Sequence, residues 1–167
     1  TDWAIGELGK YKASKPFFMA VGYYRPHIPL YAPKKYFDLY KGKDIKLPPV
    51  QKDDLDDLSP AGRRWALEAG TAGLHATTVK HGQWKAAVKA YLACVTFVDA
   101  QVGRLLAQLK AGGQQENTWV VLWSDHGWHL GEKQHWGKWT GWQRSTRVPL
   151  LLVPPTASSE KYALGGQ

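Results

Sequence analysis

The chain has 167 residues, of which 44% are hydrophobic and 22% are charged, and it carries a formal net charge of +8. This composition is that of a globular protein with one core, and it excludes an intrinsically disordered chain. The positive charge favours an anionic partner, but the basic residues are spread along the chain without zinc-finger spacing or an RNA-binding motif. We therefore expect no nucleic-acid partner.

The sequence contains neither a predicted membrane span nor an export signal. No apolar run approaches the roughly 20 residues of a membrane helix. The N-terminal sequence TDWAIGELGKY lacks the basic start and apolar centre of a signal peptide. Because the chain begins without methionine and runs directly into a helical pattern, we expect it to be a piece of a longer protein. Its single cysteine, Cys94, lies in an apolar helical pattern and is expected to be buried.

The first predicted elements are a helix and a buried strand. Hydrophobic residues recur at helical spacing over residues 2–13, and an apolar run over residues 17–24 follows them. Pro26 and Pro29 then remove amide donors and end the strand. His27, between these prolines, is therefore expected on a stiff, extended loop at the strand end.

A short helix, an irregular segment and a long helix are predicted next. A proline begins the helix of residues 33–40, and residues 41–60 are expected to form a surface excursion with a solvated acidic run. Hydrophobic residues then recur on one helical face over residues 82–110, before a Gly-Gly pair. His75 and His81, in the polar stretch before this helix, are expected at the surface.

Two further strands flank the most polar motif of the chain. Residues 118–124 and residues 149–153 are short apolar runs. With the preceding elements they predict an α/β fold, in which helices flank an open sheet. We expect one domain over residues 1–155, followed by a loosely ordered tail over residues 156–167.

Asp125 and His126 follow the strand of residues 118–124 directly, at the position where α/β proteins place ligands and metals. The carboxylate suits a hard cation such as Ca²⁺ or Mg²⁺, whereas the imidazole favours Zn²⁺ or Mn²⁺. Neighbouring side chains on a regular strand point to opposite faces, so a shared ligand requires a bend, and Gly127 supplies the freedom for it. Two donors do not complete a metal site, and a structural role for both residues stays open.

Cationic and aromatic residues follow this motif. Lys133 or Lys138 could place an ammonium over an anionic oxygen, or each could be a solvated lysine. His129 and His135 could be ligands, acids or surface residues, and their spacing does not separate these roles. The nearby tryptophans suggest either an aromatic wall, as in many carbohydrate sites, or core packing. They are Trp119, Trp123, Trp128, Trp136, Trp139 and Trp142.

Several blocks of sequence, taken in their order, resemble the sulfatases, and among these the iduronate-2-sulfatase branch. The resemblance covers residues 1–155, and order makes the set far more specific than any single block. The blocks are Lys15-Pro16-Phe17-Phe18, Arg25-Pro26-His27-Ile28-Pro29, Phe97-Val98-Asp99-Ala100-Gln101-Val102-Gly103, Asn117-Thr118, Ser124-Asp125-His126-Gly127-Trp128-His129-Leu130-Gly131-Glu132, Trp136-Gly137-Lys138 and Thr146-Arg147-Val148-Pro149-Leu150.

The resemblance implies an alkaline-phosphatase-like α/β fold and hydrolysis of sulfate esters, with sulfated carbohydrates as the expected substrates. In this family a cysteine in Cys-x-Pro-x-Arg becomes formylglycine, whose hydrate attacks sulfur, and a divalent cation, usually Ca²⁺, holds the sulfate oxygens. Asp125 and His126 match the family's metal ligands. Lys138 matches a lysine that contacts the sulfate, and His27 matches a histidine in the sulfate pocket. Relatives of this kind are secreted, periplasmic or lysosomal.

The sequence departs from the family in its nucleophile. Cys94 is followed by Val95-Thr96-Phe97-Val98, so these 167 residues contain no Cys-x-Pro-x-Arg, and the family's paired aspartates are also missing. We expect the formylglycine and the remaining ligands to lie upstream and the smaller C-terminal domain to lie downstream. The chain by itself is then expected to be inactive and to bind metal weakly.

Two other functions stay open on the sequence. A phosphatase or phosphodiesterase of the same superfamily, with a Thr or Ser nucleophile, would share the Asp-His motif. A non-catalytic module that binds anionic glycans would use the basic and aromatic residues without chemistry. Strands separated from the rest of their sheet would also expose edges and invite self-association.

Overall fold

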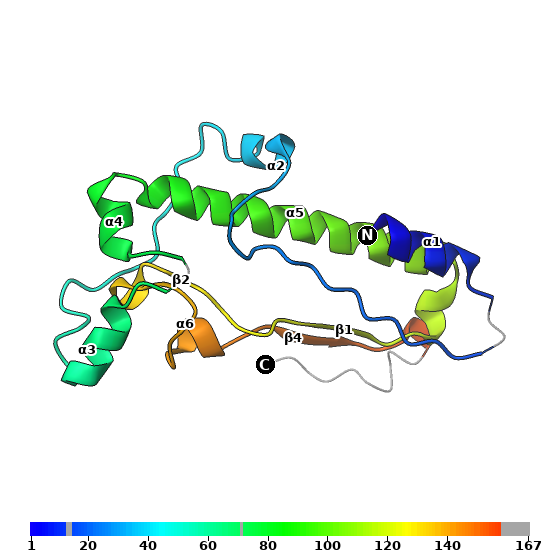
Figure 1. Ribbon diagram of the computed structural model, residues 1–167. Helices are drawn as coiled ribbons and strands as arrows, with labels where there is room; N and C mark the ends of the chain where they lie inside the picture. The colour runs from blue at the N-terminus through cyan, green and yellow to red at the C-terminus, as the bar shows by residue number, and fades with distance from the viewer. Residues whose placement is uncertain (13–14, 71, 158–167) are drawn as a thin grey trace.

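A long helix, α5 (Trp84–Ala111), spans the molecule, and the other elements lie along it (Figure 1). The structure is a computed structural model that describes residues 1–12, 15–70 and 72–157. Residues 158–167, which make up most of the expected tail, lie outside this range. The predicted helix over residues 82–110 is confirmed, because its observed ends differ only slightly from the predicted ones.

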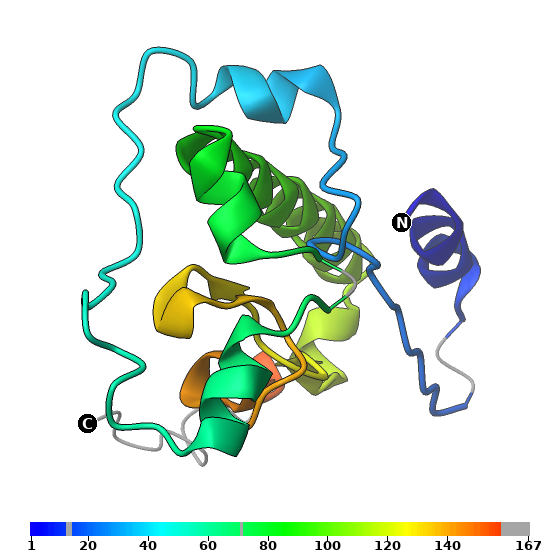
Figure 2. The ribbon, with the colours of Figure 1, turned by 60° about the vertical axis from the view of Figure 1, so that its left-hand side comes forward.

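The remaining helices are short, and most of them gather under the N-terminal half of α5 (Figures 1 and 2). The predicted helices over residues 2–13 and 33–40 are both present in shortened form. The short helices are α1 (Asp2–Lys10), α2 (Lys34–Asp38), α3 (Pro60–Leu67), α4 (His75–Lys80) and α6 (Gln143–Thr146), with 3₁₀ turns η1 (Gln114–Asn117) and η2 (Glu132–Gln134).

Two antiparallel strand pairs position the loop that contains the polar motif. Strand β1 (Val120–Trp123) pairs with β4 (Leu150–Val153), and β2 (His129–Leu130) pairs with β3 (Trp136–Gly137). Both strands predicted around the motif are therefore confirmed. Trp123 lies opposite Leu150, so the segment between them leaves and re-enters the ladder at one end.

The predicted buried strand over residues 17–24 is wrong. This segment is extended but has no strand partner in the part of the chain that the structure describes. Phe18 within it is 92% exposed. An apolar run becomes a strand only when a neighbour accepts its main-chain hydrogen bonds, and the described residues supply no such neighbour.

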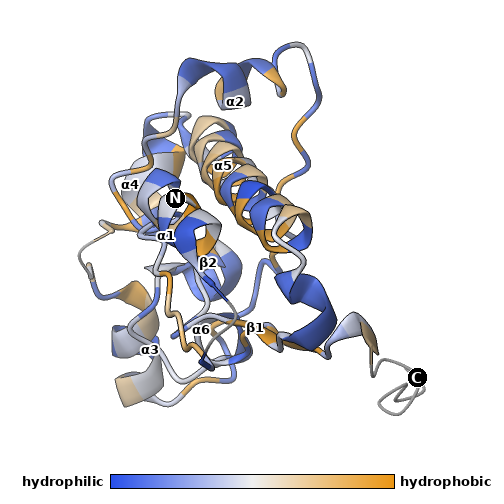
Figure 3. Cartoon of the chain, turned by 90° about the vertical axis from the view of Figure 1, so that its right-hand side faces the viewer, coloured by the Kyte–Doolittle hydropathy of each residue, from blue (hydrophilic) through white to orange (hydrophobic). Residues whose placement is uncertain are grey.

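Helix α5 qualifies as a membrane-spanning helix by length and composition alone. Its most apolar stretch is long enough to cross a membrane, and only a small part of that stretch is buried. This is weak evidence, because core helices of water-soluble proteins meet the same criterion. Hydrophobic and hydrophilic residues lie on different sides of α5 (Figure 3). The helix is nevertheless an exception to the expectation that no segment is long and apolar enough to span a membrane.

The loop after β1 is anchored on α5 through Trp84. Its indole Nε1 donates to the carbonyl of Leu130 at 2.7 Å, and its ring lies 4.6 Å from that of His75, centroid to centroid. Both rings crowd Gly131, where an added Cβ would approach them within 2.8 Å. His75 is 7% exposed, so the expectation of a surface histidine at this position is wrong. Cys94 is fully buried, as predicted.

Candidate functional site

The Asp-His motif forms a tight turn directly after β1. The Ser124 hydroxyl donates to the carbonyl of His126 at 2.9 Å, and the Gly127 N–H donates to the carbonyl of Ser145 at 2.7 Å. A Cβ at Gly127 would overlap the carbonyl of Arg144. From the sequence, a glycine was expected at this position for its backbone freedom. The structure shows a second reason, because the main chain of α6 approaches Gly127 too closely for any side chain.

Hydrogen bonding fixes the tautomer of His126. Its Nδ1 lies 2.8 Å from the carbonyl of Gly127, and a carbonyl can only accept, so Nδ1 carries the proton. The lone pair is then on Nε2, which lies 2.8 Å from the Lys138 ammonium and 3.3 Å from a carboxylate oxygen of Asp125. Lys138 therefore donates to His126, and the Asp125–His126 contact is not an ion pair.

Two cavities meet at this motif. The larger, of about 960 Å³, is lined by Asp125, His126 and Lys138 together with Trp65 and Trp139 and with other residues of the same loops. The smaller, of about 280 Å³, is lined by His27 together with Asp125 and His126. The structure thus brings three of the four candidate residues into direct contact, and it places His27 on the other side of the same turn.

The loop that carries His27 is held by its own hydrogen bonds. The Arg25 guanidinium donates to the carbonyl of Tyr31 at 2.7 Å and to that of His27 at 3.1 Å. The His27 Nδ1 donates to the carbonyl of Ile28 at 2.8 Å, and its ring lies 5.8 Å from that of Trp128, centroid to centroid. These contacts leave Nε2 of His27 as the nitrogen with the lone pair.

The described residues fit a divalent cation only in part. Within residues 1–12, 15–70 and 72–157, no group of three His, Cys, Asp or Glu side chains could hold an ion. Asp125 offers a carboxylate whose side chain is 80% exposed, and His126 offers one lone pair. Calcium takes about six to eight oxygen ligands, so most of its shell would come from other groups.

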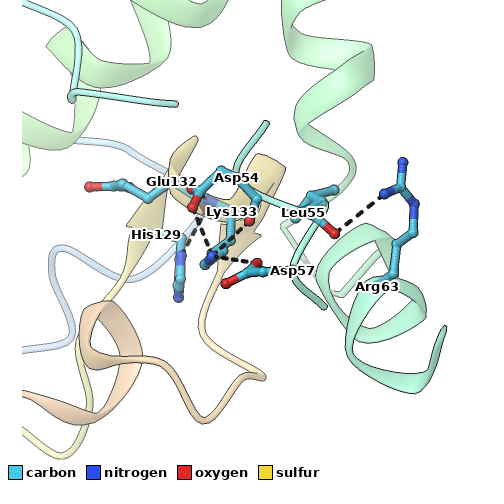
Figure 4. Close-up of polar contacts among 7 residues, drawn as sticks. All are labelled: Asp54, Leu55, Asp57, Arg63, His129, Glu132 and Lys133. Atoms are coloured by element: carbon cyan, nitrogen blue, oxygen red, sulfur yellow. Dashed lines mark hydrogen bonds and ion pairs between the residues drawn. The ribbon is translucent and has the colours of Figure 1, made fainter. Parts of the chain in front are cut away.

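Lys133 has a structural role: it pairs with Asp54 (Figure 4) and lines neither cavity. Its ammonium lies 2.7 Å from a carboxylate oxygen of Asp54, and its N–H donates to the other oxygen at 3.0 Å. The hydrogen bond to Asp54 is also the main reason why the pKa of Lys133 is raised. Asp54 is therefore not part of a solvated acidic face. Of the two lysines, Lys138 lines the larger cavity and Lys133 does not.

His129 and His135 are buried, so a surface role is wrong for both. His129 is fully buried, and its Nδ1 donates to the carbonyl of Glu132 at 3.0 Å (Figure 4). Burial lowers the pKa of His129. The Nδ1 of His135 donates to the carbonyl of Ala66 at 2.8 Å, while its Nε2 is buried without a partner in the described chain.

The tryptophan cluster divides between core, site and surface. Trp136 is 6% exposed and belongs to the core, whereas Trp139 lines the larger cavity and Trp128 the smaller one. Trp65 joins Trp139 at the larger cavity, although it lies far away in sequence. Sequence reasoning missed Trp65, and no motif marks it.

Sequence reasoning also missed Ser145 and Thr140, which line the larger cavity. Ser145 is 6% exposed, and its hydroxyl donates to the carbonyl of Lys138 at 2.6 Å. Its immediate neighbour Thr146 begins a block that resembles the family, and this proximity was the only available signal.

Comparison with known proteins gives a consistent match. A family model described as Sulfatase matches residues 1–164. A sulfatase of Formosa agariphila is 43% identical over 164 residues, which cover 96% of this chain and 31% of that protein. The iduronate 2-sulfatase of Homo sapiens is 35% identical over 164 residues, which cover 93% of this chain and 30% of that protein.

A solved structure agrees with these sequence matches. The putative sulfatase yidJ from Bacteroides fragilis superposes with a TM-score of 0.68 at 28% identity, over 92% of this chain and 30% of that one. The chain thus spans about a third of the length of the relatives that it matches. The mixed helices and strands form part of an alkaline-phosphatase-like α/β fold.

Proposed function

Because this chain belongs to the sulfatase family, we propose that it supplies the sulfate and metal contacts of an enzyme that hydrolyses sulfate esters. The observation that carries the proposal is the contact of 2.8 Å between the ammonium of Lys138 and Nε2 of His126, beside Asp125, on the wall of one cavity. The ammonium of Lys138 suits the anionic sulfate group of such an ester, and the carboxylate of Asp125 suits a metal ion that the sulfate would also bind.

Each of the four residues has a distinct task in this proposal. Lys138 binds a sulfate oxygen and stabilises the negative charge that develops during displacement. His27 hydrogen-bonds the substrate or protonates the leaving oxygen, and its braced loop favours a fixed orientation. Asp125 and His126 contribute to a divalent-cation site, for which we favour Ca²⁺. Such a cation polarises the sulfate oxygens when it is bound.

The attacking group in this proposal comes from outside these 167 residues. We propose a formylglycine, made from the cysteine of a Cys-x-Pro-x-Arg motif that the chain does not contain. Residues 1–155 would form part of one catalytic domain, and this segment alone would be inactive. The exposed apolar strands β1 and β4 would favour self-association when the segment is isolated.

We further propose sulfated carbohydrates as substrates and a secreted, periplasmic or lysosomal location. The name iduronate 2-sulfatase borne by a relative at 35% identity supports this substrate class. Trp65 and Trp139 on the wall of the larger cavity also support it, because indole rings stack well on sugars.

Hydrolysis of 4-nitrophenyl sulfate by the complete protein tests the proposed function. Lys138→Ala should lower kcat/KM about a hundredfold, as expected when one group that stabilises developing charge is lost. Lys110→Ala, at the exposed end of α5, is the matched control and should stay within about twofold of wild type. Equal rates for Lys138→Ala and wild type would contradict the assignment.

The same protein distinguishes the other two functions. Faster hydrolysis of 4-nitrophenyl phosphate than of the sulfate would favour a phosphatase or phosphodiesterase. Strong retention on heparin that survives Asp125→Ala and His126→Ala, without hydrolysis of either ester, would favour a module that only binds anionic glycans.

A further inference from the structure

Ser145 connects the two halves of the candidate site. Its main-chain carbonyl accepts the N–H of Gly127 at 2.7 Å, and its hydroxyl donates to the carbonyl of Lys138 at 2.6 Å. Gly127 closes the turn that presents Asp125 and His126. One residue of α6 therefore holds both the turn with the potential metal ligands and the main chain of the lysine.

The main-chain carbonyl of Lys138 accepts two hydrogen bonds. The donors are the hydroxyl of Ser145 and the N–H of Thr140. Ser145 is 6% exposed, so water cannot readily replace its hydroxyl. Loss of a buried donor leaves its acceptor partly unsatisfied and frees the local main chain to shift.

Two further side chains, Thr140 and His129, extend the hydrogen-bond network next to this hydroxyl. Nδ1 of buried His129 donates to a carbonyl, so its Nε2 accepts the hydroxyl of Thr140 at 2.9 Å. The oxygens of Thr140 and Ser145 lie 2.9 Å apart. Because Thr140 gives its proton to His129, its oxygen could only accept from Ser145. The Lys138 carbonyl, which can also only accept, is the nearer acceptor at 2.6 Å and takes the single proton of Ser145. The chain of contacts therefore runs from the buried imidazole to the main chain of the lysine.

We propose that Ser145 is a positioning residue that sets the placement of Lys138 relative to Asp125 and His126. Only the expected effect of Ser145 on the rate of hydrolysis rests on the proposed function. The effect on the position of Lys138 is independent of the reaction. Ser145 itself touches neither the ammonium of Lys138 nor the imidazole of His126 in the contacts described above.

The experiment compares three variants of the complete protein. Ser145→Ala removes the hydroxyl and keeps the main-chain contact with Gly127, whereas Ser145→Thr keeps a hydroxyl. Thr78→Ala is the matched control, because the Thr78 hydroxyl donates to the carbonyl of Leu74 at 3.3 Å in α4, outside both cavities. The readouts are kcat and KM on 4-nitrophenyl sulfate, the melting temperature, and the Lys138 Nζ to His126 Nε2 distance in crystal structures.

Ser145→Ala should lower kcat by about tenfold to a hundredfold with little change in KM, as a misplaced catalytic group does. Ser145→Thr should recover most of that loss, and Thr78→Ala should keep the wild-type kcat. An unchanged kcat and an unchanged Lys138–His126 distance in Ser145→Ala would overturn the proposal. The proposal would also be overturned if Thr78→Ala and Ser145→Ala lowered the melting temperature equally and lowered kcat equally.

Failure of the proposed function gives a different result. If wild type hydrolyses no sulfate ester, the crystallographic distance alone decides the role of Ser145. A displaced Lys138 in Ser145→Ala but not in Thr78→Ala would then support the positioning role, and an unmoved Lys138 would refute it.

Discussion

The ammonium of Lys138 donates a hydrogen bond to Nε2 of His126, the nitrogen through which that histidine would bind a metal. The two nitrogens lie 2.8 Å apart, and Nδ1 of His126 is committed to the carbonyl of Gly127. A metal ion bound to His126, as proposed, would therefore compete with the lysine for one nitrogen atom. A bound sulfate would resolve this competition, because its oxygens attract the ammonium away from the imidazole.

This competition predicts the effect of Lys138 on metal affinity. Removal of the ammonium by Lys138→Ala should tighten Ca²⁺ binding to the complete protein by about threefold to tenfold, since a nearby positive charge is lost. Isothermal titration calorimetry measures the dissociation constant. His126→Ala should weaken binding in the same assay, and Lys110→Ala should leave it unchanged. Weaker binding in Lys138→Ala would contradict the shared lone pair.

Gly127 should tolerate no side chain. A Cβ there would overlap the carbonyl of Arg144, so Gly127→Ala should destabilise the protein by about 1–3 kcal/mol. Urea denaturation measures the loss. Gly6→Ala is the control with the opposite sign, because Gly6 lies in α1 with nothing within 4 Å of an added Cβ. Alanine should stabilise that helix by up to about 1 kcal/mol.

The ion pair between Lys133 and Asp54 should matter more than other charge pairs of the chain. Lys133 has a positive φ of 55°, an uncommon conformation for a lysine. Asp54 binds both its N–H and its ammonium. Asp54→Asn should cost about 1–2 kcal/mol in urea denaturation. Asp57→Asn is the matched control, because Asp57 is 79% exposed and 3.8 Å from the ammonium. An equal cost in both variants would refute the special role of Asp54.

Stability should fall as the pH drops below about 6.5, the ordinary histidine value. Burial lowers the pKa of His129 and of His75 in the folded state. The unfolded chain then binds protons that the native chain does not, so acid favours unfolding. The contribution is fully present above pH 6.5 and is lost as the pH falls toward the lowered values.

Urea denaturation at several pH values between about 8 and about 5 measures this slope. His75→Gln should make the slope shallower, and His81→Gln, which replaces an exposed histidine, should leave it unchanged. A flat profile in wild type would show that these imidazoles titrate normally.

Local patterns predicted α1, α2, α5 and the strands that flank the motif, because these depend on the spacing of apolar residues. They did not predict α3, α4 or α6. The pattern of α5 needed no knowledge of its partners. Residues 17–24 show the limit of this reasoning. Their apolar run is indistinguishable from that of a strand, yet a strand also requires a hydrogen-bonding neighbour, and periodicity cannot supply one.

The sequence by itself determined the family and the identities of His27, Asp125, His126 and Lys138 as candidate residues, because matching blocks in a fixed order carry that information. Only the tertiary structure showed what Lys133 contacts, since Asp54, which binds Lys133, is remote in sequence.

Tertiary structure alone also revealed the two hydrogen bonds by which Ser145 connects Gly127 to Lys138. A serine in a short helix has no distinctive pattern in sequence. Its role comes from burial and from the direction of two hydrogen bonds, and both arise only when the loop folds back onto the end of β1.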